Sequence, residues 1–138
     1  MRYKTDRQAR RALLMHIDSN DKNFCAVIAL AQITDCSMSK AWHKLKELGR
    51  KPRRGTYIEQ SLKALDDMQY SYDPVPVRGK TVNQFTKICS KNATYFVEVR
   101  GHVLVIRGGI VRDWSEGKAN RRKIANCWKC YKTIGDKK

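Results

Sequence analysis

Apolar and polar positions divide the chain into a first half that predicts helices and a second half that predicts strands. The stretch from Phe24 to Ile33 is apolar nearly all round, and its small alanines let other elements approach closely, as in a buried central helix. The preceding residues, 18–23, are turn formers and helix-capping residues. We therefore expect Cys25 in the first turn of a buried helix.

Two more helices are expected where apolar residues recur at helical spacing. One begins at a cap formed by Ser37 or Ser39 and runs to Leu48, with Gly49 as its stop. After a basic loop that contains proline and glycine, another covers about residues 57–68. Both present one apolar face, so both are expected to pack against the central helix.

Two further helices and one loop are also predicted. A capping-box pattern over residues 81–84 predicts a short helix that ends near Cys89. Residues 5–17 are basic and are expected to form an opening helix. Residues 70–76 hold two tyrosines and two prolines, and we expect a loop whose aromatic rings seal the core. The alternative for this loop is that its rings stack on the bases of a single-stranded nucleic acid.

The second half of the chain contains runs of β-forming residues that are separated by glycines. These runs cover residues 93–99, 102–106 and 110–114, and a last strand is expected over 124–134. Together they predict a three- to four-stranded antiparallel sheet. Helices followed by strands are typical of an α+β domain in which the helices pack on one such sheet.

Length and composition fit a single domain over residues 1–138. The 138 residues, of which 41% are hydrophobic, are enough for one compact core. Residues 1–17 and 115–138 are expected as its basic terminal segments. No apolar stretch approaches the ~20 residues of a membrane helix, and no apolar run of signal-peptide type follows the N-terminus. These features predict a soluble, cytoplasmic protein without a membrane partner.

The charge is strongly unbalanced. The 29 lysines and arginines exceed the 13 acidic residues and give a net charge of +16, with basic clusters at 7–11, 50–54 and 121–123. Such an excess predicts attraction to nucleic acid or to an acidic protein surface. The alternative is that the charge serves solubility alone.

The five cysteines are too scattered for a disulfide framework, so reduced thiols are expected. Cys127 and Cys130 have the spacing of half a zinc site, but no second close-spaced pair of ligands accompanies them. A redox pair would need a helix start, whereas this segment predicts a strand. We interpret both as ordinary strand cysteines and expect no metal and no cofactor.

Cys25 is the candidate nucleophile. A thiol reacts as thiolate, and a helix N-terminus lowers its pKa through the helix dipole and free N–H groups. An imidazole beside it can accept and return the proton. Among the three histidines, His16 precedes the turn before the helix, and His43 lies in a helix whose apolar face is already occupied. His102, which opens a strand, is therefore the candidate base.

Asp113 is the candidate group that orients the base. In a hairpin that turns around residues 107–109, Asp113 lies opposite either His102 or Leu104. In both registers His102 and Asp113 share one face of the sheet, whereas pairing with Val103 would separate them. A cysteine in an apolar helix is by itself more often structural, so the prediction depends on the three residues together.

The stretch 20–31, the segment 48–56 and the hairpin around 101–114 together resemble the papain-like cysteine peptidase superfamily, and more closely small phage and bacterial proteins of that fold. The resemblance spans about residues 18–115. It implies a papain-like α+β fold and a thiol protease or isopeptidase that hydrolyses its protein or peptide substrate without a metal. A phage-encoded member would act in the host cytoplasm.

The resemblance also implies further site residues. In that superfamily an amide side chain ahead of the nucleophile, often Gln, completes the oxyanion hole. No Gln stands there in this chain, so the role falls to Asn20 or Asn23. Trp114 corresponds to the aromatic residue that shields the orienting group from water. Because the Gln is absent, the alternative is a catalytically weak or inactive binding module of the same fold, acting on nucleic acid or an acidic host protein.

Overall fold

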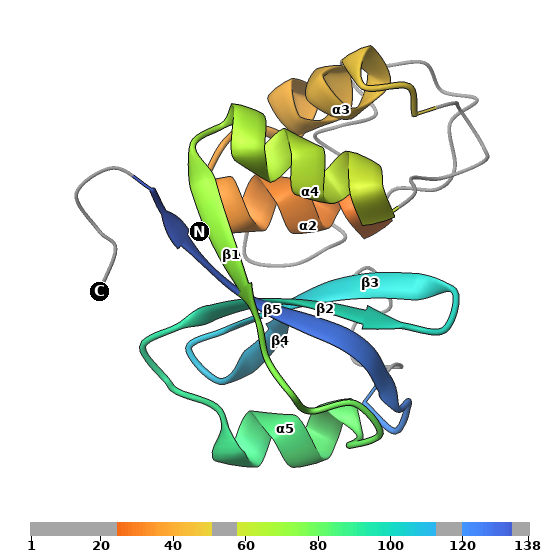
Figure 1. The fold of residues 1–138 in the computed structure, drawn as a ribbon, viewed down its shortest axis with the longest axis vertical. Coiled ribbons are helices and arrows are strands. Elements are labelled where there is room, and N and C mark those ends of the chain that lie inside the picture. The colour runs from red at the N-terminus through yellow and green to blue at the C-terminus, as the bar shows by residue number, and fades with distance from the viewer. Residues whose placement is uncertain (1–24, 51–57, 113–119, 134–138) are drawn as a thin grey trace.

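The computed structural model describes residues 25–50, 58–112 and 120–133. Within these ranges, three helices lie on one face of a five-stranded antiparallel sheet and one short helix lies on the other face (Figure 1). The predicted α+β class, with helices in the N-terminal half and an antiparallel sheet in the C-terminal half, is confirmed. The helices are α2 (Cys25–Thr34), α3 (Met38–Glu47), α4 (Ile58–Asp67) and α5 (Val82–Ile88).

The sheet has the strand order β1-β5-β2-β3-β4. Its long hairpin of β2 and β3 joins Thr94 to Arg107 and Val99 to His102. The expected strand near the C-terminus forms β5, an interior strand that lies between β1 and β2. The strands are β1 (Tyr70–Pro74), β2 (Thr94–Val99), β3 (His102–Arg107), β4 (Ile110–Arg112) and β5 (Ile124–Lys132).

The prediction of three or four strands was wrong because residues 70–74 form a strand where a loop was expected. This strand, β1, pairs with β5 along its whole length, with Tyr72 opposite Cys130. Tyr70 and Tyr72 alternate with polar residues and pack against the helical side of the sheet, which is the period of a half-buried strand. Pro74 stands at the strand's end, where a missing N–H is tolerated.

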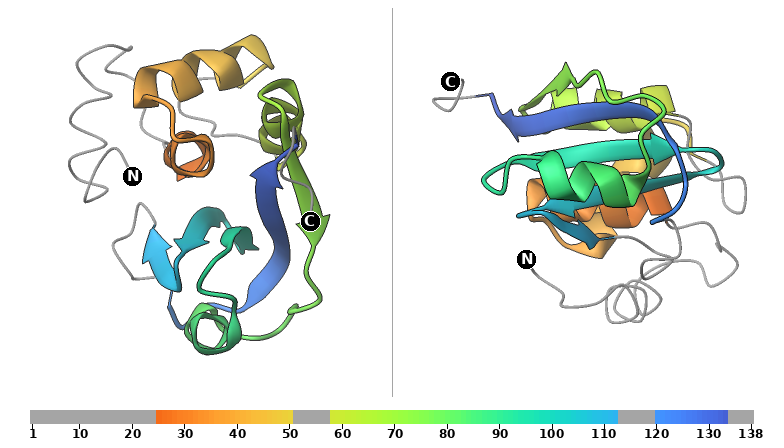
Figure 2. Two further views of the ribbon diagram at one scale, coloured as in Figure 1. Left: turned by 90° about the vertical axis from the view of Figure 1, so that its left-hand side faces the viewer. Right: turned by 90° about the horizontal axis from the view of Figure 1, so that it is seen from below.

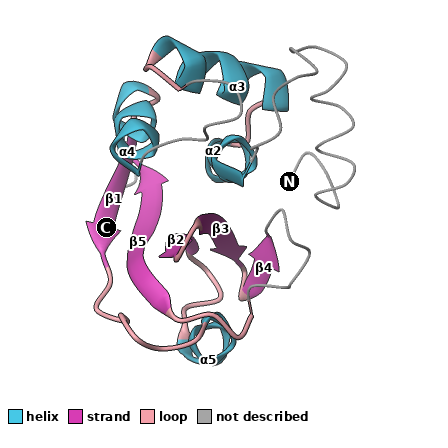
Figure 3. Ribbon diagram, turned by 90° about the vertical axis from the view of Figure 1, so that its right-hand side faces the viewer, coloured by secondary structure: helices cyan, strands magenta, loops and turns pink. Residues whose placement is uncertain are grey.

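The central helix α2 is apolar over nearly its whole surface, and almost all of its residues are buried. Residues 26–33 are all buried, and they pack against α3, α4 and the sheet. The left view of Figure 2 and Figure 3 show α2 nearly end-on, with α3 above it, α4 on one side and the strands below. Burial of this kind stabilises a helix that has no polar face of its own.

Local signals for the helix ends are confirmed. The Ser37 hydroxyl accepts a hydrogen bond from the Lys40 N–H at 3.1 Å at the start of α3, and Gly49 follows the helix with a positive φ of 103°. At α5, the Thr81 hydroxyl and the Gln84 side chain form the predicted capping box.

A β-bulge in β5 decides which residues face each side of the sheet. Glu98 pairs with Asn126 and Val99 with Ile124, so Ala125 is an extra residue in β5. As a result, Ile124 and Cys127 both join the smaller core beneath α5, while Cys130 joins the core beneath α2. The sheet thus separates two apolar cores.

Two predictions concern other features of the chain. The opening helix over 5–17 lies outside the described residues. Within the ranges that the structure does describe, no helix is both long enough and apolar enough to cross a lipid bilayer.

Candidate functional site

Cys25 and His102 lie in contact at one end of the sheet. Cys25 is the first residue of α2, and His102 is the first residue of β3. Their side chains are joined by a hydrogen bond, and both residues are partly buried. The structure therefore brings the predicted nucleophile and the predicted base together.

The turn that precedes β3 places His102. Val99 and His102 form the last pair of the β2–β3 hairpin, so only Arg100 and Gly101 lie between the strands. Gly101 has a φ of +73°, a conformation that costs glycine little and other residues more. This short turn fixes His102 at the strand's start, opposite the N-terminus of α2.

The surroundings of Cys25 lower its pKa below the ordinary value of 9.0. Burial of the thiol is the largest single influence and by itself raises the pKa. The hydrogen bond with His102, the charge of its imidazole and the N–H groups of Val103 and Ala26 together outweigh burial. The Ala26 N–H has no partner within an α-helix at this position, which is why a helix N-terminus can stabilise an anion.

The remaining predicted site residues lie outside the described ranges. These are the orienting Asp113, the shielding Trp114 and the two candidate oxyanion residues, Asn20 and Asn23. In the described pairing of β3 with β4, Arg107 lies opposite Ile110. This matches the register that was predicted with Asp113 opposite Leu104, and not the one with Asp113 opposite His102.

His43 lies elsewhere, as its place in the sequence predicted. It is exposed on α3, where its ring and the Trp42 ring pack edge to face with 4.9 Å between the ring centroids. It helps to line a hollow of about 680 Å³ that also includes Thr34, at the C-terminal end of α2. A helix of this length spans about 15 Å, so this hollow lies far from Cys25.

Cys127 and Cys130 face opposite sides of the sheet. Cys127 is buried in the core beneath α5, and Cys130 in the core beneath α2. Burial raises the pKa of each thiol to about 12. Two residues on opposite faces cannot hold one zinc ion or form one redox pair, so both are ordinary strand cysteines, as predicted. Within the described residues, no three His, Cys, Asp or Glu side chains cluster as metal ligands would.

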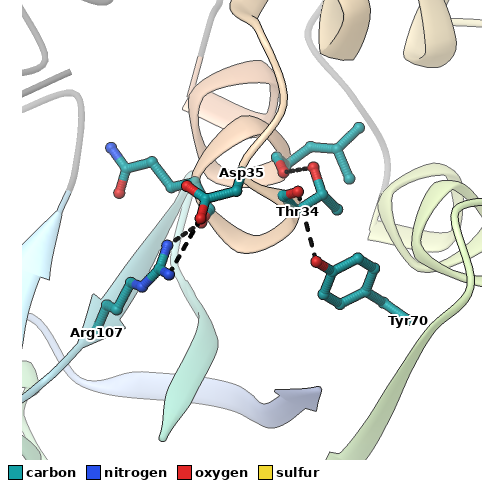
Figure 4. A network of polar contacts seen from close by, with 6 residues as sticks. Thr34, Asp35, Tyr70 and Arg107 are labelled. Atoms are coloured by element: carbon teal, nitrogen blue, oxygen red, sulfur yellow. Dashed lines mark hydrogen bonds and ion pairs between the residues drawn. The ribbon is translucent and has the colours of Figure 1, made fainter. Parts of the chain in front are cut away.

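One contact of the helix that carries Cys25 was not predicted. Arg107, the last residue of β3, donates a hydrogen bond to the Gln32 carbonyl at 2.9 Å and contacts the Asp35 carboxylate at 3.4 Å (Figure 4). On the other side of this helix end, the Tyr70 hydroxyl donates to the Thr34 carbonyl at 3.5 Å. No local pattern signals the Arg107 contact, because its partner is 75 residues away in the sequence.

The strand β3 therefore holds α2 at both ends, through His102 at the N-terminus and Arg107 at the C-terminus. A thiol with a lowered pKa, beside an imidazole and at a helix N-terminus, has what nucleophilic attack on a carbonyl carbon requires.

Comparisons of the chain with protein-family models, curated proteins and solved structures find no match.

Proposed function

We propose that the chain is a papain-like cysteine hydrolase, a thiol protease or isopeptidase, with Cys25 as nucleophile and His102 as base. The observation that supports this function best is the hydrogen bond between the two side chains, accompanied by the lowered pKa of Cys25. Cys25 itself is only partly buried. Asp113 is the proposed orienting residue of the triad.

In the proposed acylation step, the Cys25 thiolate attacks the carbonyl carbon of a peptide or isopeptide bond. Negative charge moves to the carbonyl oxygen, where the Cys25 N–H and the amide of Asn20 or Asn23 stabilise it. The His102 imidazolium then gives its proton to the leaving nitrogen. The carbon–nitrogen bond breaks, the amine departs, and a thioester on Cys25 remains.

In the proposed deacylation step, water replaces the amine. Neutral His102 takes a proton from a water molecule, whose oxygen attacks the thioester carbon. The carbon–sulfur bond breaks, the carboxylic acid leaves, and the proton on His102 again stabilises the Cys25 thiolate. The cycle needs no metal, because the imidazole handles each proton.

Alkylation by iodoacetamide tests the proposed nucleophile. At about pH 6 to 7, Cys25 is expected to react much faster than the other described cysteines, because thiolate is the reactive form. Cys127 and Cys130, with a pKa of about 12, hold only about one thiolate in 10⁵ at neutral pH. Mass spectrometry of peptides from the intact folded protein would give the rate for each thiol.

Two matched variants make this test specific. Cys25→Ala is expected to abolish both the fast labelling and the cleavage of a peptide library, whereas Cys36→Ala, at another partly buried cysteine, is expected to leave both intact. Slow, uniform labelling of all thiols would rule out an activated nucleophile. Fast labelling of Cys25 without cleavage of any peptide or isopeptide bond would instead support the inactive binding module.

A further inference from the structure

Six cationic side chains are exposed at the end of the sheet where β3 begins. They come from three segments that are far apart in the sequence: the turn before α5, the turn between β2 and β3, and the approach to β5. We call them the basic edge. Its residues are Arg78, Lys80, Arg100, Arg121, Arg122 and Lys123.

Backbone hydrogen bonds bring two of these segments together. The Gly79 N–H donates to the Ile124 carbonyl at 2.9 Å, and the Ile124 N–H donates to the Lys80 carbonyl at 2.8 Å. The Val82 N–H donates to the Arg122 carbonyl at 3.0 Å. This ladder fixes the cations of residues 78–80 beside those of 121–123, so their clustering follows from the backbone.

A side-chain contact ties in the third segment. Arg122 donates from Nη1 to the Arg100 carbonyl at 3.1 Å. Arg100 lies in the turn between β2 and β3, two residues before His102. The basic edge therefore adjoins the candidate site.

Acidic side chains do not balance this charge within the described residues. Residues 75–97 and 120–133 contain no Asp or Glu. The nearest in sequence is Glu98, which accepts a hydrogen bond from Asn126 at 2.8 Å and lies on the α2 side, opposite Val103. Asp67, in the helical layer, is paired with Lys44 at 3.1 Å.

We propose that the basic edge binds the phosphate backbone of a nucleic acid. Repeated phosphates need only an array of cations, because affinity arises largely from the release of condensed counterions. A protein partner would need an apolar centre in the interface. The large apolar side chains most exposed in the described structure, Ile88 and Ile110, lie on α5 and β4 and outside the basic edge.

This inference does not depend on catalysis by Cys25. A nucleic acid on the basic edge would pass the turn that carries Arg100, next to His102. If the proposed hydrolase is also correct, its substrates would be proteins bound to the same nucleic acid. If it is not, the basic edge still defines a nucleic-acid-binding protein.

Salt-dependent binding of a labelled DNA duplex of about 20 base pairs to the full chain tests the proposal. The triple variant Lys80→Gln, Arg121→Gln and Lys123→Gln removes three exposed cations. It is expected to weaken binding at least about tenfold near 0.1 M salt and to reduce the slope of log K against log salt by about 2 to 3. The same measurement on single-stranded RNA gives the preferred form of nucleic acid.

A second triple variant serves as the matched control. Lys40→Gln, Lys129→Gln and Lys132→Gln removes the same charge from exposed positions on α3 and β5, away from the basic edge. It is expected to change the slope by less than about 1. Equal weakening by both triples would show that net charge alone attracts DNA and would overturn the proposal. A polyglutamate peptide that binds the basic edge more tightly than DNA would overturn it in favour of an acidic protein partner.

Discussion

Arg107 donates a hydrogen bond from Nη1 to the carbonyl oxygen of Gln32 at 2.9 Å, at the C-terminal end of the helix that carries Cys25. A guanidinium at this end satisfies a helix carbonyl and interacts favourably with the helix dipole. Since His102 lies at the other end of the same strand, the two contacts fix the helix lengthwise against β3. We therefore expect the contact between the Cys25 thiol and the His102 imidazole to depend on Arg107, which lies at the far end of the six-residue strand β3.

Replacing this arginine is expected to loosen the helix. Arg107→Gln removes a charge-assisted hydrogen bond that is about one-third exposed, so the free energy of unfolding should fall by about 1 kcal/mol. Alkylation of Cys25 at neutral pH should also slow, because the thiol meets His102 less often. Urea denaturation and labelling kinetics measure the two effects. The control Lys87→Gln, at an exposed position on α5, should change neither; a loss of stability with unchanged labelling would remove Arg107 from any positioning role.

The pKa of Cys25 is expected to depend on His102. In His102→Ala the hydrogen bond and the imidazole charge are lost while burial, which raises the pKa, persists. The pH at which Cys25 reaches half of its maximal alkylation rate should therefore move upward, whereas His43→Ala should leave it unchanged. In the native chain, the depressed pKa stabilises the fold above pH 9.0, and this contribution disappears as the pH falls through the folded-state value. A midpoint that does not move in His102→Ala would contradict the contact.

The two cysteines of β5 are expected to destabilise the fold in alkali. Their pKa of about 12 in the folded state exceeds the ordinary 9.0, so the unfolded chain loses these protons first. The contribution of these two thiols to the free energy of unfolding is therefore fully present below pH 9.0 and is lost as the pH rises toward about 12. The variants Cys127→Val and Cys130→Val keep an apolar side chain but remove the titration, and should reduce the decline. Urea unfolding at several alkaline pH values measures it, with Cys36→Val as the control; equal declines in all proteins would assign the alkaline loss to other groups.

Much of the helical layer could be predicted because its signals are local. The apolar run around Cys25, the Ser37 cap and the capping box at Thr81 each act within a few residues, and each forms where expected. The pairing of Cys25 with His102 followed from the chemistry of thiols and from the place of each residue in its element. Spacing along the chain does not reveal a contact between residues this far apart in sequence; His102 was inferred by excluding His16 and His43 and from the resemblance to papain-like peptidases.

The features that were missed depend on partners distant in the chain. Tyr72 of β1 lies opposite Cys130 of β5, and no pattern near residue 72 identifies that neighbour. The alternation of tyrosine with polar residues was present, but Pro74 and Pro76 made a loop the simpler interpretation. The contact of Arg107 could not be predicted for the same reason, because its hydrogen-bond acceptor lies in a helix 75 residues earlier in the sequence.

The additional residue at Ala125 has a consequence for any shortened form of the chain. Without it, Ile124 would turn over to the opposite side of β5, because side chains alternate along a strand. The core beneath α5 would lose a buried isoleucine. The backbone hydrogen bonds that align residues 79–82 with 122–124 would lose their register. A single deletion near the start of β5 would thereby separate the cations of the basic edge, although none of them had been replaced.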